Sequence, residues 1–140
     1  MPIVLTLIKE LADYEKEANQ VKTSVGELVQ DGFCENPLFK VVCADFDGEV
    51  VGMVLYYYGY STWKGKMVYI DDIVVSERFR RMGVGQKLFD YIRKEAKEKN
   101  ANQIRFHVLE WNEPAINFYK KNGTSLDEDW VLCKLENEDM

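Results

Sequence analysis

The sequence predicts a mixed α/β fold built as one domain over residues 1–140. Three observations support this prediction: apolar residues recur at helical spacing near the N-terminus, strand-like segments follow in the middle, and a glycine-containing loop then leads from a strand into a helix. Of the 140 residues, 46% are hydrophobic and 30% are charged. This size and composition fit one domain with a real core and exclude disorder as the main state.

The first part of the chain predicts two helices. Apolar residues recur at i, i+4, i+7 and i+11 from Leu7 to Ala18 with charged residues between them, which predicts an amphipathic helix that begins almost at the first residue. Ser24 followed by Glu27 is a capping-box signal for a short second helix, which Asp31-Gly32 ends.

The rest of the chain predicts strands and helices in alternation, giving the order ααβββαβαβ. An Asp47-Gly48 turn is expected to join the first two strands in a hairpin, and the third strand is rich enough in Val, Ile and Tyr to be central. The expected elements are strands at 39–46, 50–60 and 67–75, a loop at 76–82, a helix at 84–99, a strand at 104–109, a helix at 114–121 ended by Gly123, and a strand at 130–135.

Charge and cysteine content exclude several classes of protein. The net charge is -6, yet residues 78–99 are predominantly basic, which favours a small polyanion over nucleic acid, while the acidic remainder favours a small cation. Solvated helix faces are the alternative. The longest uncharged stretch, residues 50–63, is too short to cross a membrane, and the N-terminus has no basic leader for secretion. Three cysteines without a CxxC pair favour a reducing cytoplasm, so we expect a cytoplasmic protein without membrane or nucleic-acid partners.

Residues 80–85, Arg-Arg-Met-Gly-Val-Gly, lie between the predicted central strand and a helix. Glycines let a phosphate approach the backbone, amides at a helix N-terminus favour an anion, and arginines add charge-assisted hydrogen bonds. The segment is neither a Walker loop nor a Rossmann fingerprint, because Leu88 stands where the third glycine would be. It is a candidate anion site, with an ordinary turn as the alternative.

Asp71 and Asp72 interrupt the predicted central strand, and strand alternation places their side chains on opposite faces of the sheet. Buried carboxylates are costly unless paired, so they are either structural, in an ion pair or at an edge, or functional, as a general base or a cation anchor. His107, the one histidine, is expected to be half-buried and hydrogen-bonded. No metal site is expected, because no second ligand lies near it in sequence.

A third candidate segment covers residues 110–123. Asn112 is a plausible helix cap with Pro114 in the first turn, and Tyr119 shares a helix face with Ile116. A tyrosine at such a position is either core filler or a catalytic acid.

Together these segments resemble the GCN5-related N-acetyltransferase (GNAT) superfamily: a strand, R-x-x-G-x-G opening a helix, another strand, and then N-E-P-A-I-N-F-Y-K-K-N-G at 112–123. Residues 7–15, 110–114 and 116–119 are similar more specifically to the diamine (spermidine/spermine) acetyltransferase family, which includes thialysine acetylases. The resemblance covers nearly the whole chain. It implies a GNAT fold, which is a central, mostly antiparallel twisted sheet flanked by helices, with acetyl-CoA as cosubstrate, no metal, and a homodimer.

The resemblance also implies residue roles. The R-x-x-G-x-G turn would hold the pyrophosphate of acetyl-CoA, Asp71 would serve the amine, and Tyr119 would be the general acid. The implied cofactor-binding residues are Ile73, Val74, Val75, Arg80, Arg81, Met82, Gly83, Val84, Gly85, Gln86, Asn112 and Tyr119. The implied substrate-binding residues are Tyr14, Glu15, Trp63, Asp71, Asp72, Arg105, Phe106, His107, Glu128 and Trp130.

Some positions depart from the family. Asp71 stands where polyamine acetylases usually have glutamate, and Ser61 stands where they tend to have aspartate. The family's first strand normally precedes the helix at Leu7, so either the sheet lacks this edge strand or the start of the sequence is truncated. A shorter diamine or an amino acid side chain is therefore more plausible than a long polyamine.

The implied activity is acetyl transfer from acetyl-CoA to a primary amine of a small cationic substrate, either a diamine or polyamine or a thialysine-like compound. Transfer would be direct, in a ternary complex. Two alternatives stay open: a non-catalytic acyl-CoA-binding sensor, and an acetyltransferase for protein lysines or amino-termini.

Overall fold

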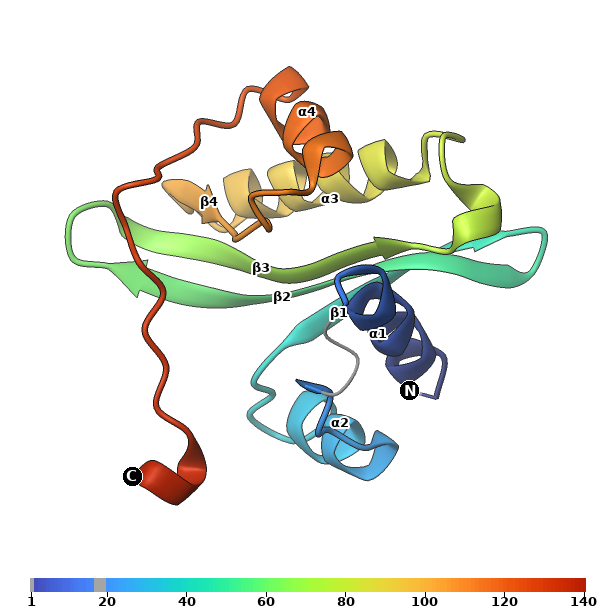
Figure 1. Ribbon diagram of the computed structural model, residues 1–140, viewed down its shortest axis with the longest axis horizontal. Coiled ribbons are helices and arrows are strands. Elements are labelled where there is room, and N and C mark those ends of the chain that lie inside the picture. The colour runs from blue at the N-terminus through green and yellow to red at the C-terminus, as the bar shows by residue number, and fades with distance from the viewer. Residues whose placement is uncertain (1, 17–19) are drawn as a thin grey trace. The chain divides into compact units, whose positions relative to one another are not determined.

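The computed structural model describes residues 2–16 and 20–140 (Figure 1). These residues form two compact units, residues 1–107 and residues 108–140, which we call the first and the second unit. The expectation of one domain over the whole chain stays a prediction. No described helix is long and apolar enough to cross a membrane.

The first unit contains a four-stranded sheet in the order β1-β2-β3-β4. The first three strands are antiparallel, and β4 runs parallel to β3, which confirms a mixed α/β fold with a mostly antiparallel sheet. Asp47 and Gly48 both have positive φ and form the predicted hairpin turn. The strands are β1 (Lys40–Phe46), β2 (Glu49–Ser61), β3 (Gly65–Val75) and β4 (Gln103–Arg105).

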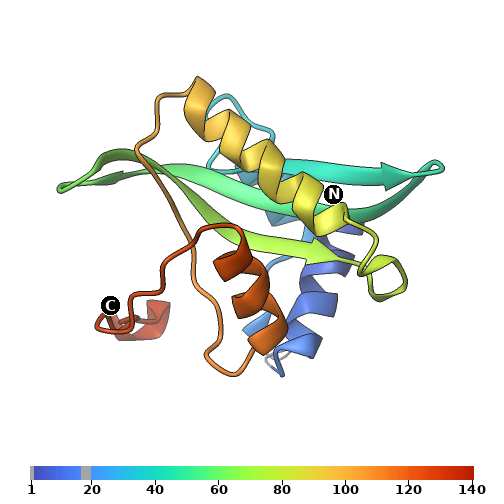
Figure 2. The ribbon, with the colours of Figure 1, turned by 90° about the horizontal axis from the view of Figure 1, so that it is seen from above.

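Helices cover both faces of this sheet (Figures 1 and 2). On one face lie α1 (Pro2–Tyr14) and α2 (Val25–Gly32), and Ser24 caps α2 as predicted, its Oγ accepting from the Glu27 amide at 3.2 Å. Buried side chains of Val4, Leu7 and Leu28 pack there against Met53 and Val74 of the sheet. The other face is covered by α3 (Val84–Glu98), the helix predicted at 84–99.

Glycine at position 52 of β2 lets α3 lie close to the sheet. A Cβ at this position would stand 2.9 Å from the Val74 carbonyl oxygen and 3.2 Å from a Val84 methyl carbon. Farther along the same face, the Tyr56 hydroxyl donates to the Glu95 carboxylate at 2.9 Å and so ties β2 to α3.

A β-bulge in β3 corrects one prediction. Leu55 pairs with Asp72 and Tyr56 pairs with Ile70, so Asp71 is an extra residue between them. An extra residue breaks the alternation of side chains, and Asp71 and Asp72 therefore both line the face that α1 covers. The expectation of opposite faces was wrong because strict alternation holds only for a strand without a bulge.

The bulge also marks where β4 ends. The pairing of β4 with β3 runs from Met67↔Gln103 to Tyr69↔Arg105. It stops two residues before Asp71, the extra residue of the bulge. A bulge disrupts the ladder and increases the local twist, which accounts for a strand of three residues where one over 104–109 was expected.

The second unit contains one α-helix, α4 (Glu113–Lys121), among its described residues. Asn112 is its N-cap, as predicted, with its Oδ1 accepting from the Ala115 amide at 3.4 Å, and Gly123 has φ 86° just after its end. The strand expected at 130–135 is not formed, and Trp130, Val131 and Leu132 are more than half exposed. A strand needs a partner for its backbone groups, and residues 108–140 contain none.

Candidate active site

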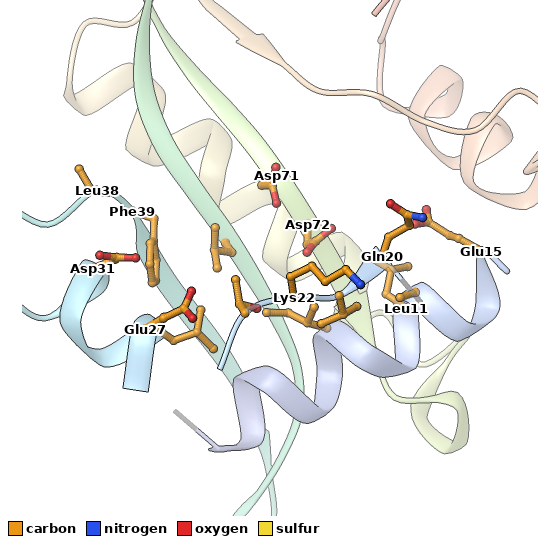
Figure 3. Close-up of a pocket in the computed structure, with 16 residues that line it drawn as sticks. Leu11, Glu15, Gln20, Lys22, Glu27, Asp31, Leu38, Phe39, Asp71 and Asp72 are labelled. Carbon is orange, nitrogen blue, oxygen red and sulfur yellow. The ribbon is translucent and has the colours of Figure 1, made fainter. Parts of the chain in front are cut away.

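A pocket of about 470 Å³ opens in the first unit on the face that carries α1 and α2 (Figure 3). This volume lies within the range of small-molecule sites, roughly 300–1,000 Å³. Its apolar walls include Leu11, Leu28 and Phe39, and Leu55 lines it from β2. Its charged lining residues are Glu15, Lys22, Glu27, Asp31, Asp71 and Asp72.

Asp72 is the most strongly perturbed acid of this pocket. Burial, followed by the charges of Asp71 and Glu15, raises the pKa of its carboxyl from an ordinary 3.8 to about 7. Its side chain is half-buried, and the bulge places Asp71 beside it on the same wall. A cation that entered the pocket would stabilise the ionised carboxylates and so reverse this shift.

Asp71 is more open to solvent than Asp72. Its side chain is exposed, yet the protein around it removes enough water to raise the pKa of its carboxyl as well. An accessible carboxylate with a raised pKa is suited to accepting a proton from an amine.

An aromatic pair stands on β2 and β3 next to Asp71. The rings of Tyr57 and Tyr69 stack with centroids 5.2 Å apart, and the Tyr69 hydroxyl is hydrogen-bonded to Nδ1 of His107. Burial, followed by the Asp71 charge, raises the pKa of Tyr57. His107 is hydrogen-bonded as predicted but exposed rather than half-buried. Among the described residues there is no group of three or more His, Cys, Asp or Glu side chains that could hold a metal.

The loop before α3 has the geometry of an anion site. Gly83 is the N-cap of α3 with φ 82°, and Arg81 also has positive φ, at 66°. A Cβ on Gly83 would meet nothing within 4 Å, so glycine serves the backbone conformation there and leaves the approach to the first-turn amides open. Arg80, Arg81 and Met82 are exposed beside these amides.

Three contacts hold this loop and the residues just before it against the rest of the first unit. The Arg80 Nε donates to the Val75 carbonyl at 3.2 Å, and the Arg80 guanidinium lies 5.2 Å from the centroid of the Tyr14 ring. The Glu77 amide donates to the Glu10 carboxylate of α1 at 3.0 Å. Tyr14 therefore supports the basic loop, and its contact with substrate stays a prediction.

The segment of β3 beyond the bulge has one edge without a strand partner. Pairing with β4 ends at Tyr69, whereas β3 continues to Val75 and pairs there only with β2 among the described strands. This segment, Ile73, Val74 and Val75, is the stretch for which the resemblance implied pairing with the pantetheine arm.

Several predicted substrate residues do not line the pocket. Trp63 is 79% exposed in the turn between β2 and β3, and Phe106 packs edge-on against Phe89 of α3, with centroids 6.0 Å apart. Arg105 is exposed and donates to the Gln103 side chain at 2.8 Å. Their contact with an amine substrate stays a prediction.

The second unit holds the remaining predicted residues. Asn112 and Tyr119 are buried, 6% and 8% exposed, at the start and near the end of α4, and the Tyr119 ring lies 5.4 Å from that of Phe118. Trp130 is 69% exposed, and Glu128 is exposed as well. The roles of these four residues stay predictions.

Three charged pocket residues were not predicted: Lys22, Glu27 and Asp31. Glu27 and Asp31 are four residues apart on α2 and therefore share a helix face, a spacing that is visible in the sequence. Lys22 lies between the two helices, where no local pattern indicates the direction of a side chain.

Known proteins are similar to this chain over almost its whole length. The acetyltransferase (GNAT) family model matches residues 6–124. The thialysine N-epsilon-acetyltransferases of Bos taurus and Mus musculus are each 40% identical to it over 148 residues, which cover 98% of this chain and 87% of theirs. The spermidine/spermine N(1)-acetyltransferase-like protein 1 of Homo sapiens is 31% identical over 99% of this chain and 21% of its own length.

Solved structures show the same fold. The aminoglycoside acetyltransferase meta-AAC0020, from an uncultured soil metagenomic sample, superposes with a TM-score of 0.77, covering 96% of this chain and 88% of its own, at 20% sequence identity.

Proposed function

Given that the chain belongs to the acetyltransferase (GNAT) family, we propose that it transfers the acetyl group of acetyl-CoA to a primary amine of a small cationic substrate. The substrate class is a diamine or polyamine, or a thialysine-like amino acid. The observation that carries this proposal is the pocket with Glu15, Asp71 and Asp72 on its walls, because clustered carboxylates select a cation. The names of the thialysine and spermidine/spermine relatives support the same class of substrate.

The basic loop supports binding of acetyl-CoA. An open helix N-terminus at Gly83, with exposed Arg80 and Arg81 beside it, fits a pyrophosphate. The edge of β3 at residues 73–75, which has no partner among the described strands, fits an extended amide-containing chain. The residues proposed to hold acetyl-CoA are thus 73–75 and 80–86, with Asn112 and Tyr119 added on the resemblance alone. When bound, acetyl-CoA supplies the thioester that is attacked.

The reaction first needs a route for the proton that makes the substrate amine a cation. An amine of lysine type has a pKa of about 10.4, so making it neutral at pH 7 costs about 4.6 kcal/mol. We assign that proton to Asp71, directly or through a water, while Glu15 and Asp72 hold the cation. The neutral amine nitrogen then attacks the thioester carbonyl, and the C–S bond breaks. Tyr119 protonates the leaving thiolate, and the second proton, which the nitrogen loses as the amide forms, returns to the Tyr119 oxygen. No covalent enzyme intermediate forms.

A homodimer and a cytoplasmic location are the remaining parts of the proposal. The homodimer rests on the resemblance to the family, and the location rests on three cysteines without a CxxC pair. No membrane or nucleic-acid partner is proposed.

The test is release of free thiol from acetyl-CoA by the purified protein against putrescine, spermidine, spermine, lysine, thialysine and a lysine peptide. We expect saturable turnover with at least one small amine and loss of it in Asp71→Asn. Asp45→Asn, on the exposed edge of β1, is the matched control. Acetyl-CoA binding without thiol release from any mixture would instead favour an acyl-CoA sensor.

A further inference from the structure

The segment that leads from β3 into the basic loop is held by the helix α1. This segment forms a short 3₁₀ helix, η2 (Glu77–Phe79), whose N-cap is Ser76. The Ser76 side chain makes no capping hydrogen bond to a described residue. The half-buried Glu10 of α1 supplies an acceptor instead, and its carboxylate accepts from the Glu77 amide at 3.0 Å.

A second contact with α1 follows directly after η2. The Arg80 guanidinium lies 5.2 Å from the centroid of the Tyr14 ring, and the Arg80 Nε donates to the Val75 carbonyl at 3.2 Å. The backbone of residues 77–80 is therefore fixed by α1 at one end and by α1 together with β3 at the other.

These two contacts come from one face of α1, and the acidic pocket lies on the next. Glu10 and Tyr14 are four residues apart and so share a helix face. Leu11 and Glu15, which line the acidic pocket (Figure 3), are also four residues apart, and the Glu15 amide donates to the Leu11 carbonyl at 2.9 Å. This second pair lies about 100° around the helix from the first. One helix thus serves both proposed binding sites.

The conformation of the basic loop needs support of this kind. Arg81 has φ 66°, a left-handed conformation that costs a non-glycine residue free energy and persists only where the surrounding structure holds it. It lies between Arg80 and the N-cap of α3, Gly83, beside the amides proposed to receive the pyrophosphate. Contacts that fix residues 77–80 therefore act on the conformation that leaves these amides open.

The negative charge of Glu10 does not suit a direct contact with acetyl-CoA. A carboxylate near the loop repels a pyrophosphate, so this charge opposes binding of the cosubstrate. The hydrogen bond of Glu10 to the Glu77 amide favours binding instead, because it keeps the loop in place. The charge and the hydrogen bond thus have effects of opposite sign, and substitutions can separate them.

We propose that Glu10 and Tyr14 are positioning residues for acetyl-CoA: they hold residues 77–80 so that the basic loop presents its amides and arginines to the pyrophosphate. This proposal rests on the proposed function, because it concerns binding of the same cosubstrate. When either contact is lost, a smaller fraction of the protein has the loop in the binding conformation. The Kd for acetyl-CoA rises in inverse proportion to that fraction.

The test compares Glu10→Ala, which removes the charge and the acceptor, with Glu10→Gln, which removes the charge and keeps an acceptor oxygen. Calorimetry measures the Kd for acetyl-CoA. Glu10→Ala should raise this Kd by roughly 10-fold, the size of a hydrogen bond to a charged group, and Glu10→Gln should raise it much less or lower it. Kinetics should show the KM for the amine unchanged in both.

The Tyr14 contact is tested in the same way. Tyr14→Leu should raise the Kd for acetyl-CoA by roughly 2–5-fold, the size of an exposed contact between a cation and an aromatic ring, and Tyr14→Phe should restore it because the ring is kept. Asp13→Ala is the matched control for both residues, since it removes an exposed negative charge from the same helix and should not raise the Kd.

Amide hydrogen exchange gives a readout that does not need acetyl-CoA. The Glu77 amide should be protected in the wild type and in Glu10→Gln, and should exchange faster in Glu10→Ala. An unchanged or lower Kd in Glu10→Ala, or an unchanged exchange rate at Glu77, would overturn the proposal while wild-type turnover stands. A wild-type protein that binds no acetyl-CoA would refute the proposed function, and this inference with it.

Discussion

The first unit carries two charged sites of opposite sign, and the same strand leads from one to the other. The acidic pocket is recessed: Asp72 is half-buried and its pKa is raised to about 7. The basic loop, reached from β3 through Val75, is open: Arg80 and Arg81 are exposed, and the space over Gly83 is empty to 4 Å. In the recessed pocket, exclusion of water changes the pKa of the acids. The open loop instead offers exposed charges and backbone amides.

This difference means that the two sites respond to different conditions. Protonation of the pocket acids weakens the attraction for a cation as the pH falls through 7, while exposed arginines keep their charge at every ordinary pH. Exposed charges are screened by salt much more than buried ones. Affinity for the amine should therefore depend mainly on pH, and affinity for acetyl-CoA mainly on ionic strength.

The largest effect is expected from removing the proposed base. Asp71→Asn should lower kcat by roughly 10²–10⁴-fold, since the amine then has no proton acceptor, and should leave the Kd for acetyl-CoA unchanged. Steady-state kinetics and calorimetry measure the two quantities. A variant that loses affinity for acetyl-CoA as well would show that the acidic and basic sites are not separate.

A smaller loss is expected from the second unit. Tyr119→Phe should lower kcat by roughly 10²-fold with little change in the Kd for the amine, because the hydroxyl protonates the leaving thiolate. Thermal unfolding checks that the buried ring still packs. Phe118→Tyr, which adds a hydroxyl on the neighbouring residue, is a control for altered polarity on α4. Unchanged turnover in Tyr119→Phe would remove this residue from the mechanism.

Stability should depend on pH through Asp72. Its folded pKa, about 7, lies above the ordinary 3.8, so between these pH values the folded state binds more protons than the unfolded state. The free energy of unfolding therefore falls as the pH rises from 4 to 7. Asp72→Asn should abolish this fall and be more stable than the wild type at pH 8 by about 4 kcal/mol. Urea unfolding at several pH values measures the free energy of unfolding of both proteins. The same dependence of this free energy on pH in both would contradict the raised pKa of Asp72.

The smallest effect is expected at the open site. Arg81→Gln should raise the KM for acetyl-CoA by roughly 5–10-fold and leave the KM for the amine unchanged, because an exposed arginine contributes about 1 kcal/mol through a charge-assisted hydrogen bond. The wild-type KM for acetyl-CoA should also rise with ionic strength, and less so in the variant. Lys94→Gln on α3 is the control for a general loss of positive charge. A change in the KM for the amine alone would contradict the assignment of Arg81 to acetyl-CoA binding.

Features that depend on neighbours in sequence were predictable. The caps at Ser24 and Asn112, the Asp47-Gly48 turn and the loop that opens α3 all involve residues within four positions of each other. Hydrophobic periodicity indicated the helices and the long strands for the same reason. The strand expected at 130–135 has suitable side chains but no partner within its own unit, and pairing cannot be seen in one segment.

Only the tertiary structure decided how the acidic pocket is composed. The sequence by itself determined two adjacent aspartates in a strand, a basic glycine-containing loop and a capped helix bearing Tyr119. The bulge that turns Asp71 and Asp72 to one face depends on the register of β3 against β2. The meeting of these acids with Glu15, Lys22 and α2 depends on how helices far apart in sequence pack on that face. Long-range pairing and packing have no local signature, so the basic loop was predictable from sequence and the selectivity of the pocket was not.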